Sequence, residues 1–130
     1  MPHQIIEYSG NLDGDIDIDE LVQALHDTAI SIDVLPTGGI RTRAVRHDHY
    51  QIADGHSDNS FIYVVLRIMK GRTPEQKKDA GERLFGTLLE FVDSVYQERP
   101  MALSFEIQEI DPEVRWKQGN IRDYMAKRAN

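Results

Sequence analysis

The sequence predicts an α/β (α+β) fold in which two consecutive βαβ units form one four-stranded mixed sheet with both helices on one face. The pattern strand, helix, strand occurs twice, in pseudo-repeats that cover about residues 2–55 and 60–110. In each repeat a helix connects the two strands, which is typical of parallel neighbours. With 130 residues, 40% of them hydrophobic, the chain has room for a single domain over 1–130.

The first unit starts almost at the first residue. Residues 4–8 are rich in apolar side chains and alternate as a short strand does. Apolar residues then recur at three- and four-residue spacing, and Asp17 is suited to cap the helix that we expect over about 17–32. The segment 36–39, rich in proline and glycine, ends this helix, and residues 40–52 predict a second strand.

The second unit has the clearer pattern. Residues 61–69 are β-branched and aromatic with almost no polar alternation, which predicts a strand covered on both faces. Thr73 and Gln76 form a capping box at the start of an amphipathic helix that ends before Pro100. The fourth strand is then expected over 101–110.

Two features predict that copies of the chain associate. Two helices cover only one face of a sheet, so the apolar second face of strand 61–69 predicts that the chain oligomerises through its sheet. The tail 111–130 is polar apart from a few large side chains such as Trp116, and it is too polar to form a core of its own. We therefore expect the tail to pack on a neighbouring subunit.

Charge and composition exclude several classes of partner. The chain has 22 acidic and 15 basic residues and a formal net charge of −7, whereas proteins that bind phosphate backbones present a basic face, so no nucleic acid is expected. No apolar run is long enough to span a membrane, and the first residues lack a signal-peptide pattern, which predicts a cytoplasmic protein with no membrane partner. Cysteine is absent, which excludes thiolate ligands and nucleophiles.

Two segments raise the question of a metal. The acidic run 13–20 lacks the glycine and glutamate that a calcium loop needs at its sixth and twelfth positions. His47 and His49 would point to one side of the second strand, which leaves a zinc or iron site open, but the sequence does not indicate a third ligand. An exposed strand end and loop is the favoured interpretation, and no metal is expected.

Three arginines and one proline are candidates for chemistry. Arg41 and Arg43 are two residues apart on the expected second strand and face the same way, and Arg72 follows the third strand. Guanidinium groups at strand ends suit a carboxylated ligand, although surface salt bridges account for them about equally well. Pro2 would have a free secondary amine after removal of the initiator methionine, and a neutral amine there would serve as a general base near pH 7.

Several segments carry a resemblance to a known family, namely Met1-Pro2-His3, Pro36 to Arg43, Gln51-Ile52-Ala53-Asp54-Gly55, Gly71-Arg72-Thr73, Ala102-Leu103-Ser104-Phe105-Glu106-Ile107 and Lys117-Gln118-Gly119-Asn120. On these residues the chain resembles the tautomerase superfamily, and within it the trimeric 5-carboxymethyl-2-hydroxymuconate isomerases of homoprotocatechuate breakdown. The resemblance extends nearly from end to end.

The resemblance implies a homotrimer of tautomerase-like fold that isomerises a small carboxylate substrate of aromatic catabolism without a cofactor. In that family the N-terminal proline shuttles a proton and two arginines hold carboxylates, which implies these roles for Pro2, Arg41 and Arg72, with Arg43 as a weaker candidate. Retention of Met1 would turn the proline nitrogen into an amide and abolish its basicity. Two alternatives stay open: a tautomerase of a different enol, and a non-catalytic oligomeric binding protein of the same fold.

Overall fold

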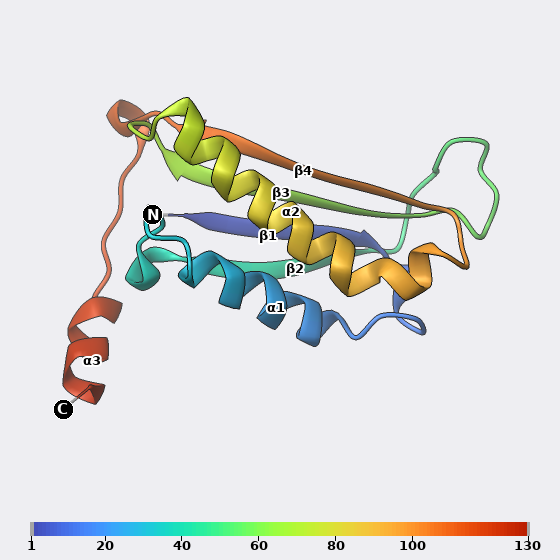
Figure 1. Cartoon of the computed structure of the whole chain (residues 1–130), viewed down its shortest axis with the longest axis horizontal. Helices are drawn as coiled ribbons and strands as arrows, with labels where there is room; N and C mark the ends of the chain where they lie inside the picture. The colour runs from blue at the N-terminus through green and yellow to red at the C-terminus, as the bar shows by residue number, and fades with distance from the viewer. Residues whose placement is uncertain (1, 130) are drawn as a thin grey trace.

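Four strands form one sheet in the order β2-β1-β3-β4 (Figure 1). The computed structural model describes residues 2–129. Strand β1 is parallel to β2 and antiparallel to β3, and β3 is parallel to β4. The two βαβ units therefore meet at their first strands, and the expected four-stranded mixed sheet is confirmed. The strands are β1 (His3–Ser9), β2 (Arg41–His47), β3 (Ser60–Met69) and β4 (Met101–Ile110).

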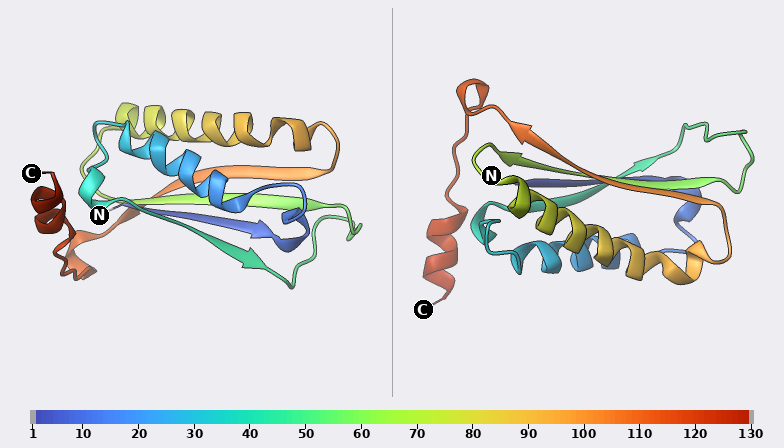
Figure 2. Two further views of the ribbon diagram at one scale, coloured as in Figure 1. Left: turned by 90° about the horizontal axis from the view of Figure 1, so that it is seen from below. Right: turned by 45° about the horizontal axis from the view of Figure 1, so that its top comes forward.

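Both long helices, α1 (Ile18–Ile30) and α2 (Pro74–Tyr96), lie on the same face of this sheet (Figure 2). Helix α1 begins after Asp17, whose side chain accepts a hydrogen bond from the backbone N–H of Glu20. Helix α2 begins with the predicted capping box. Each cap satisfies backbone N–H groups that have no partner within the helix, which is why both helices start at these residues.

The core lies between the helices and one face of the sheet. Ile6, Ile62 and Leu66 point to the helices and are 0% exposed. Burial of each such side chain contributes about 1.5–3 kcal/mol, so this layer fixes the position of β1 and with it the first residues of the chain. The side chains that meet them from the helices are also fully buried: Leu21, Leu25, Leu84 and Leu88.

Strand β2 is shorter than the sequence predicts, because it ends at His47 rather than Ile52. Its only neighbour in the sheet is β1, whose last residue, Ser9, pairs with His47, so residues beyond this point have no strand to pair with. Residues 48–59 form a loop instead. His49 is thus not on the strand with His47, and the described residues contain no group of three or more His, Cys, Asp or Glu side chains able to hold a metal.

The second face of the sheet is open in the single chain, so the cover expected on both faces of β3 stays a prediction about the assembled protein. Along this face β3 carries Phe61 and Tyr63, which are half-buried, Val65, which is buried, and Arg67, which is exposed. Arg67 therefore interrupts the apolar side chains of this face before the last residue of the strand, Met69, which is half-buried. The sequence pattern alone does not show which layers cover the sheet.

The tail contains a helix that the sequence does not predict. After β4 the chain runs along the end of the sheet and forms α3 (Ile121–Arg128), which projects from the sheet and helices (Figure 1). The side chain of Arg122 lies over Gly38, where a Cβ atom would come within 2.6 Å of its Cγ, so only glycine permits this contact. Trp116 is 86% exposed in the single chain. No helix within residues 2–129 is long and apolar enough to cross a membrane.

Arg99 joins three segments at the end of the sheet opposite to the N-terminus. Its Nη1 donates to the carbonyl oxygen of Asn11 at 3.2 Å and to the carboxylate of Asp15 at 2.5 Å, and its Nη2 donates to the carbonyl oxygen of Asp58 at 2.8 Å. The side chain is 17% exposed, so these bonds are partly shielded from water. Arg99 therefore holds the loop before α1 against the loop before β3.

We expect Arg99→Ala to lower the free energy of unfolding by about 2 kcal/mol, because two carbonyl oxygens and a carboxylate lose a partly buried charged donor. Urea unfolding followed by circular dichroism measures this. Arg83→Ala is the control, because its guanidinium lies on the exposed surface 3.7 Å from Asp79, and such pairs contribute less than about 1 kcal/mol. Equal effects of the two substitutions would contradict the role of Arg99.

Candidate active site

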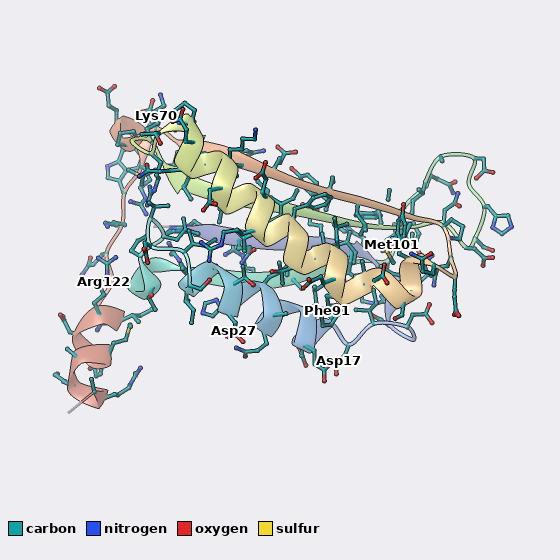
Figure 3. All side chains as sticks on the ribbon, viewed as in Figure 1. Asp17, Asp27, Lys70, Phe91, Met101 and Arg122 are labelled. Atoms are coloured by element: carbon teal, nitrogen blue, oxygen red, sulfur yellow. The ribbon has the colours of Figure 1, made fainter. Side chains whose placement is uncertain are left out.

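Pro2 lies at the end of the sheet where β1 and β2 begin and β3 ends. It is buried, and its carbonyl oxygen accepts a hydrogen bond of 3.1 Å from the backbone N–H of Arg41. Lys70, directly after β3, and Met101, at the start of β4, mark the two ends of the sheet in Figure 3. Arg72 follows Lys70 closely, so strand direction brings all the predicted site residues to one end. Met1 is outside the described residues.

On the helix side of the sheet, a chain of polar side chains begins two residues after Pro2. Gln4 is 0% exposed, and its Nε2 donates to the hydroxyl of Thr42 at 3.2 Å and to the carbonyl oxygen of Leu25 at 3.3 Å. The same hydroxyl lies 2.8 Å from Nδ1 of His26. These bonds tie α1 to β1 and β2 beside the site. Sequence reasoning missed all three side chains, because a single polar residue in a strand carries no local signal of its partners.

On the open side, Arg41 and Arg43 project from β2 as expected. Nη1 of Arg43 lies 3.2 Å from Nδ1 of His3. Burial first, and then the positive charges of Arg41 and Arg43, together lower the pKa of His3 from 6.5 to about 4. His3 is therefore neutral at pH 7. Because a guanidinium only donates, Nδ1 accepts and the ring proton is on Nε2.

Arg72 is held by backbone carbonyl groups. Its Nε and Nη2 donate to the carbonyl oxygen of Val34 at 3.2 and 2.9 Å, and its Nη1 donates to that of Met69 at 3.0 Å. Three of the five N–H groups of a guanidinium are thus engaged, which leaves two for a ligand. Within residues 2–129, no hydrogen bond or ion pair connects Arg72 to Arg41 or Arg43. It is a rigid donor at the same end of the sheet, and the sequence did not indicate its backbone partners.

A cavity of about 450 Å³ adjoins Arg41. It is lined by His26, by the turn Thr37–Gly39, and by the tail over residues 117–123. A hollow of about 530 Å³ between α2 and β4 contains none of the predicted site residues and lies beside Lys77 and Phe85. Arg41 is the only one of the predicted site residues that lines the first of these cavities in the described chain.

Two paired βαβ units with a proline directly before the first strand define the fold as that of the tautomerases. A solved fused 4-OT superposes with a TM-score of 0.67 at 19% identity, over 95% of this chain and 98% of that one. Another fused 4-OT, described as a symmetric trimer, superposes with a TM-score of 0.64 at 15% identity, over 91% of this chain and 92% of that one. At such identities the likeness shows the fold alone.

The sequence places the chain within that class. Residues 2–125 match the family model described as 5-carboxymethyl-2-hydroxymuconate isomerase. A 5-carboxymethyl-2-hydroxymuconate Delta-isomerase of Escherichia coli is 36% identical over 121 residues, which cover 93% of this chain and 96% of that protein. The solved isomerase of Deinococcus radiodurans R1 is 35% identical with a TM-score of 0.88, over 95% and 93% of the two chains. This chain belongs to the 5-carboxymethyl-2-hydroxymuconate isomerase family, which confirms the resemblance seen in the sequence.

We expect the imidazole of His3 to titrate near pH 4 in NMR spectra of the folded protein. Arg43→Gln should raise this pKa because it removes one of the positive charges, whereas Arg83→Gln on α2 should leave it unchanged. Since the ordinary pKa is 6.5, the unfolded chain binds more protons than the folded chain between pH 4 and 6.5. The stabilising contribution of neutral His3 is therefore lost as the pH falls through this range. Titration of His3 near 6.5 would contradict this account.

Proposed function

We propose that this chain isomerises 5-carboxymethyl-2-hydroxymuconate without a cofactor, in the cytoplasmic breakdown of homoprotocatechuate, with Pro2 as general acid and base. The observation that carries the proposal is the position of Pro2, buried directly before the central strand β1 and hydrogen-bonded to the backbone of Arg41. Membership of the isomerase family supports the substrate. Removal of Met1 is a condition of the proposal, since only then is the nitrogen an amine.

In the proposed reaction the neutral amine of Pro2 removes the proton of the 2-hydroxyl group. The oxygen electrons form the C2 carbonyl, the C2–C3 double bond moves to C3–C4, and the C4–C5 electron pair takes a proton from the Pro2 ammonium at C5. The proton leaves and returns through one nitrogen, so nothing else is consumed. Burial and the positive charge of Arg41 both disfavour the ammonium form, which keeps the amine ready to accept the first proton.

The arginines have different proposed roles. Arg41 is exposed on the open face beside Pro2, where its guanidinium stabilises negative charge that develops on the 2-oxygen. Arg72 is fixed by two carbonyl oxygens, so its two remaining N–H groups bind a carboxylate without a further loss of side-chain freedom. Arg43 is hydrogen-bonded to His3 and is the weaker candidate for direct contact with the reacting atoms.

We also propose that the chain is a homotrimer that associates through the open face of its sheet, with the tail 111–130 packed on a neighbouring subunit. Val65 is already 6% exposed on that face, and Val45 is 43% exposed beside it. Trp116, at 86% exposure, is a large apolar side chain without cover in the single chain. The trimer described for one fused 4-OT of this fold supports the number of subunits. Light scattering that reports a monomer at micromolar concentration would contradict it.

Pro2→Ala is expected to lower kcat/KM about 10- to 100-fold, because a primary amine still accepts a proton but is less rigid and has a different basicity. A variant that retains Met1, verified by intact mass, should lose at least about 1000-fold, the upper part of the range that general acid–base catalysis supplies. The loss of dienol absorbance measures both. Ala53→Ser in the exposed loop is the control. Full turnover by the Met1-retaining protein would contradict a proline base and favour a binding role.

Arg41→Ala is expected to lower kcat about 10- to 100-fold with little change in KM, because the lost contact forms mainly in the transition state. Arg72→Ala should raise KM about 10-fold, because it holds a carboxylate in both the ground state and the transition state. Lysine at either position should restore activity only in part, since a point charge does not reproduce a planar fork. Arg43→Ala is the internal control. If Arg43→Ala lowers kcat while Arg41→Ala keeps full kcat, the roles assigned to Arg41 and Arg43 are reversed.

A further inference from the structure

A row of basic residues crosses the open face next to Pro2, and the proposed reaction uses only part of it. The row consists of His3, Arg41, Arg43 and Arg67. In the register of the sheet, His3 pairs with Arg41 of β2 on one side and with Arg67 of β3 on the other. Neighbouring strands are about 4.7–4.9 Å apart, so the backbone positions of the two arginines lie directly on either side of His3. Arg67 follows neither from a motif nor from the family resemblance.

Three arginines of this face have no anionic partner in the described chain, unlike Arg46, Arg83 and Arg99. Arg46 and Arg99 form ion pairs with aspartates. Among the described residues, no ion pair includes Arg41, Arg43 or Arg67. Unpaired guanidinium groups gathered at one end of a sheet repel one another, so their arrangement favours a bound anion.

The acidic side chains of the open face are engaged elsewhere. Glu7 lies 2.8 Å from Nε2 of His47. Glu106 accepts a hydrogen bond of 2.8 Å from Gln108, and this bond and that to Tyr63 lower the pKa of its carboxyl group. Neither glutamate forms an ion pair with an arginine of the row in the described chain. The end of the face next to Pro2 is therefore cationic, and its middle is neutralised locally.

His3 contributes a hydrogen-bond donor to the row and no charge, because its imidazole is neutral. Its Nδ1 accepts from Arg43, so its Nε2–H is available to donate. Arg115, in the segment after β4, adds to the positive potential that keeps this imidazole neutral. The row thus offers hydrogen-bond donors, which is the complement of a carboxylate with its four lone-pair sites.

We propose that Arg67, together with the Nε2–H of His3, binds the carboxylate of the 5-carboxymethyl arm of the substrate and so determines the preference for a tricarboxylate.

 This carboxymethyl arm is what distinguishes the substrate from an unbranched dicarboxylic dienol. The inference rests on the proposed function, because it assigns a contact to the third carboxylate of that substrate. Arg67 is then a specificity-determining residue, distinct from Arg41 and Arg72, which serve the other oxygens.

The position of the row fits this role. His3 directly follows Pro2, and the Cα atoms of two consecutive residues are about 3.8 Å apart. If copies of the chain associate through the open face, three unpaired guanidinium groups at an interface would be costly without a counter-charge. A substrate carboxylate supplies that charge when it binds. The repulsion among the guanidinium groups is then relieved, and this relief favours a ligand that carries a third carboxylate.

The test compares a tricarboxylate with a matching dicarboxylate in each of two assays. Kinetics use the tricarboxylic dienol and the matching unbranched dicarboxylic dienol, and calorimetry uses the unreactive propane-1,2,3-tricarboxylate and glutarate. Arg67→Gln should raise KM and Kd for the tricarboxylates about 10-fold or more and change those of the dicarboxylates less than about 2-fold, as expected for one charged hydrogen-bonded contact. Arg67→Lys should restore part of the preference. Arg83→Gln, with the same change of charge on the exposed side of α2, should have no effect.

A second measurement does not depend on activity. Binding of propane-1,2,3-tricarboxylate should raise the pKa of His3 from about 4, because the anion offsets the guanidinium charges, and this rise should shrink in Arg67→Gln. The inference is overturned if Arg67→Gln weakens both ligands equally, weakens neither, or dissociates the oligomer. Selective binding by a protein with no isomerase activity would instead refute the proposed function and leave the carboxylate site standing.

Discussion

The structure depends on the central position of β1, which is paired on both sides from its first residue. His3 pairs with β2 and β3 at once, so the beginning of the chain is held by two ladders of hydrogen bonds rather than left free. Chain ends usually fray unless such pairing fixes them. This constraint explains how Pro2, directly before β1, can be buried in a defined position. It also explains why the arginines of two different strands gather around it.

The pleat of β1 gives its two faces different tasks. Gln4, Ile6 and Tyr8 face the helices, where apolar packing and one polar chain through Thr42 hold α1 in place. His3 faces the open side, among side chains that have donors and charge. Because successive side chains point to opposite faces, adjacent residues can serve stability and ligand binding without competing. A shift of the register by one residue would exchange the two sets.

The arginines at the two ends of the sheet have different kinds of partner. At the end away from Pro2, aspartates of the loop before α1 neutralise Arg46 and Arg99, and those arginines join loops. At the end that contains Pro2, Arg72 is bound to backbone carbonyl groups and Arg43 to a neutral histidine, so the charge of these two arginines remains available to an anion. An acidic protein can therefore bind an acidic substrate, because short-range arrangement, and not net charge, sets the local potential.

The sequence by itself determined the features that depend on neighbouring residues. The cap at Asp17, the capping box at Thr73 and the bounds of β4 all follow from local patterns, and the motifs identified the family. It also indicated Pro2 and the shared direction of Arg41 and Arg43. Only the tertiary structure decided what depends on a partner far along the chain. Strand β2 ends at His47 because β1 ends opposite it, and Arg67 flanks His3 because β1 and β3 pair antiparallel. No local pattern encodes either, since register is a property of two segments together.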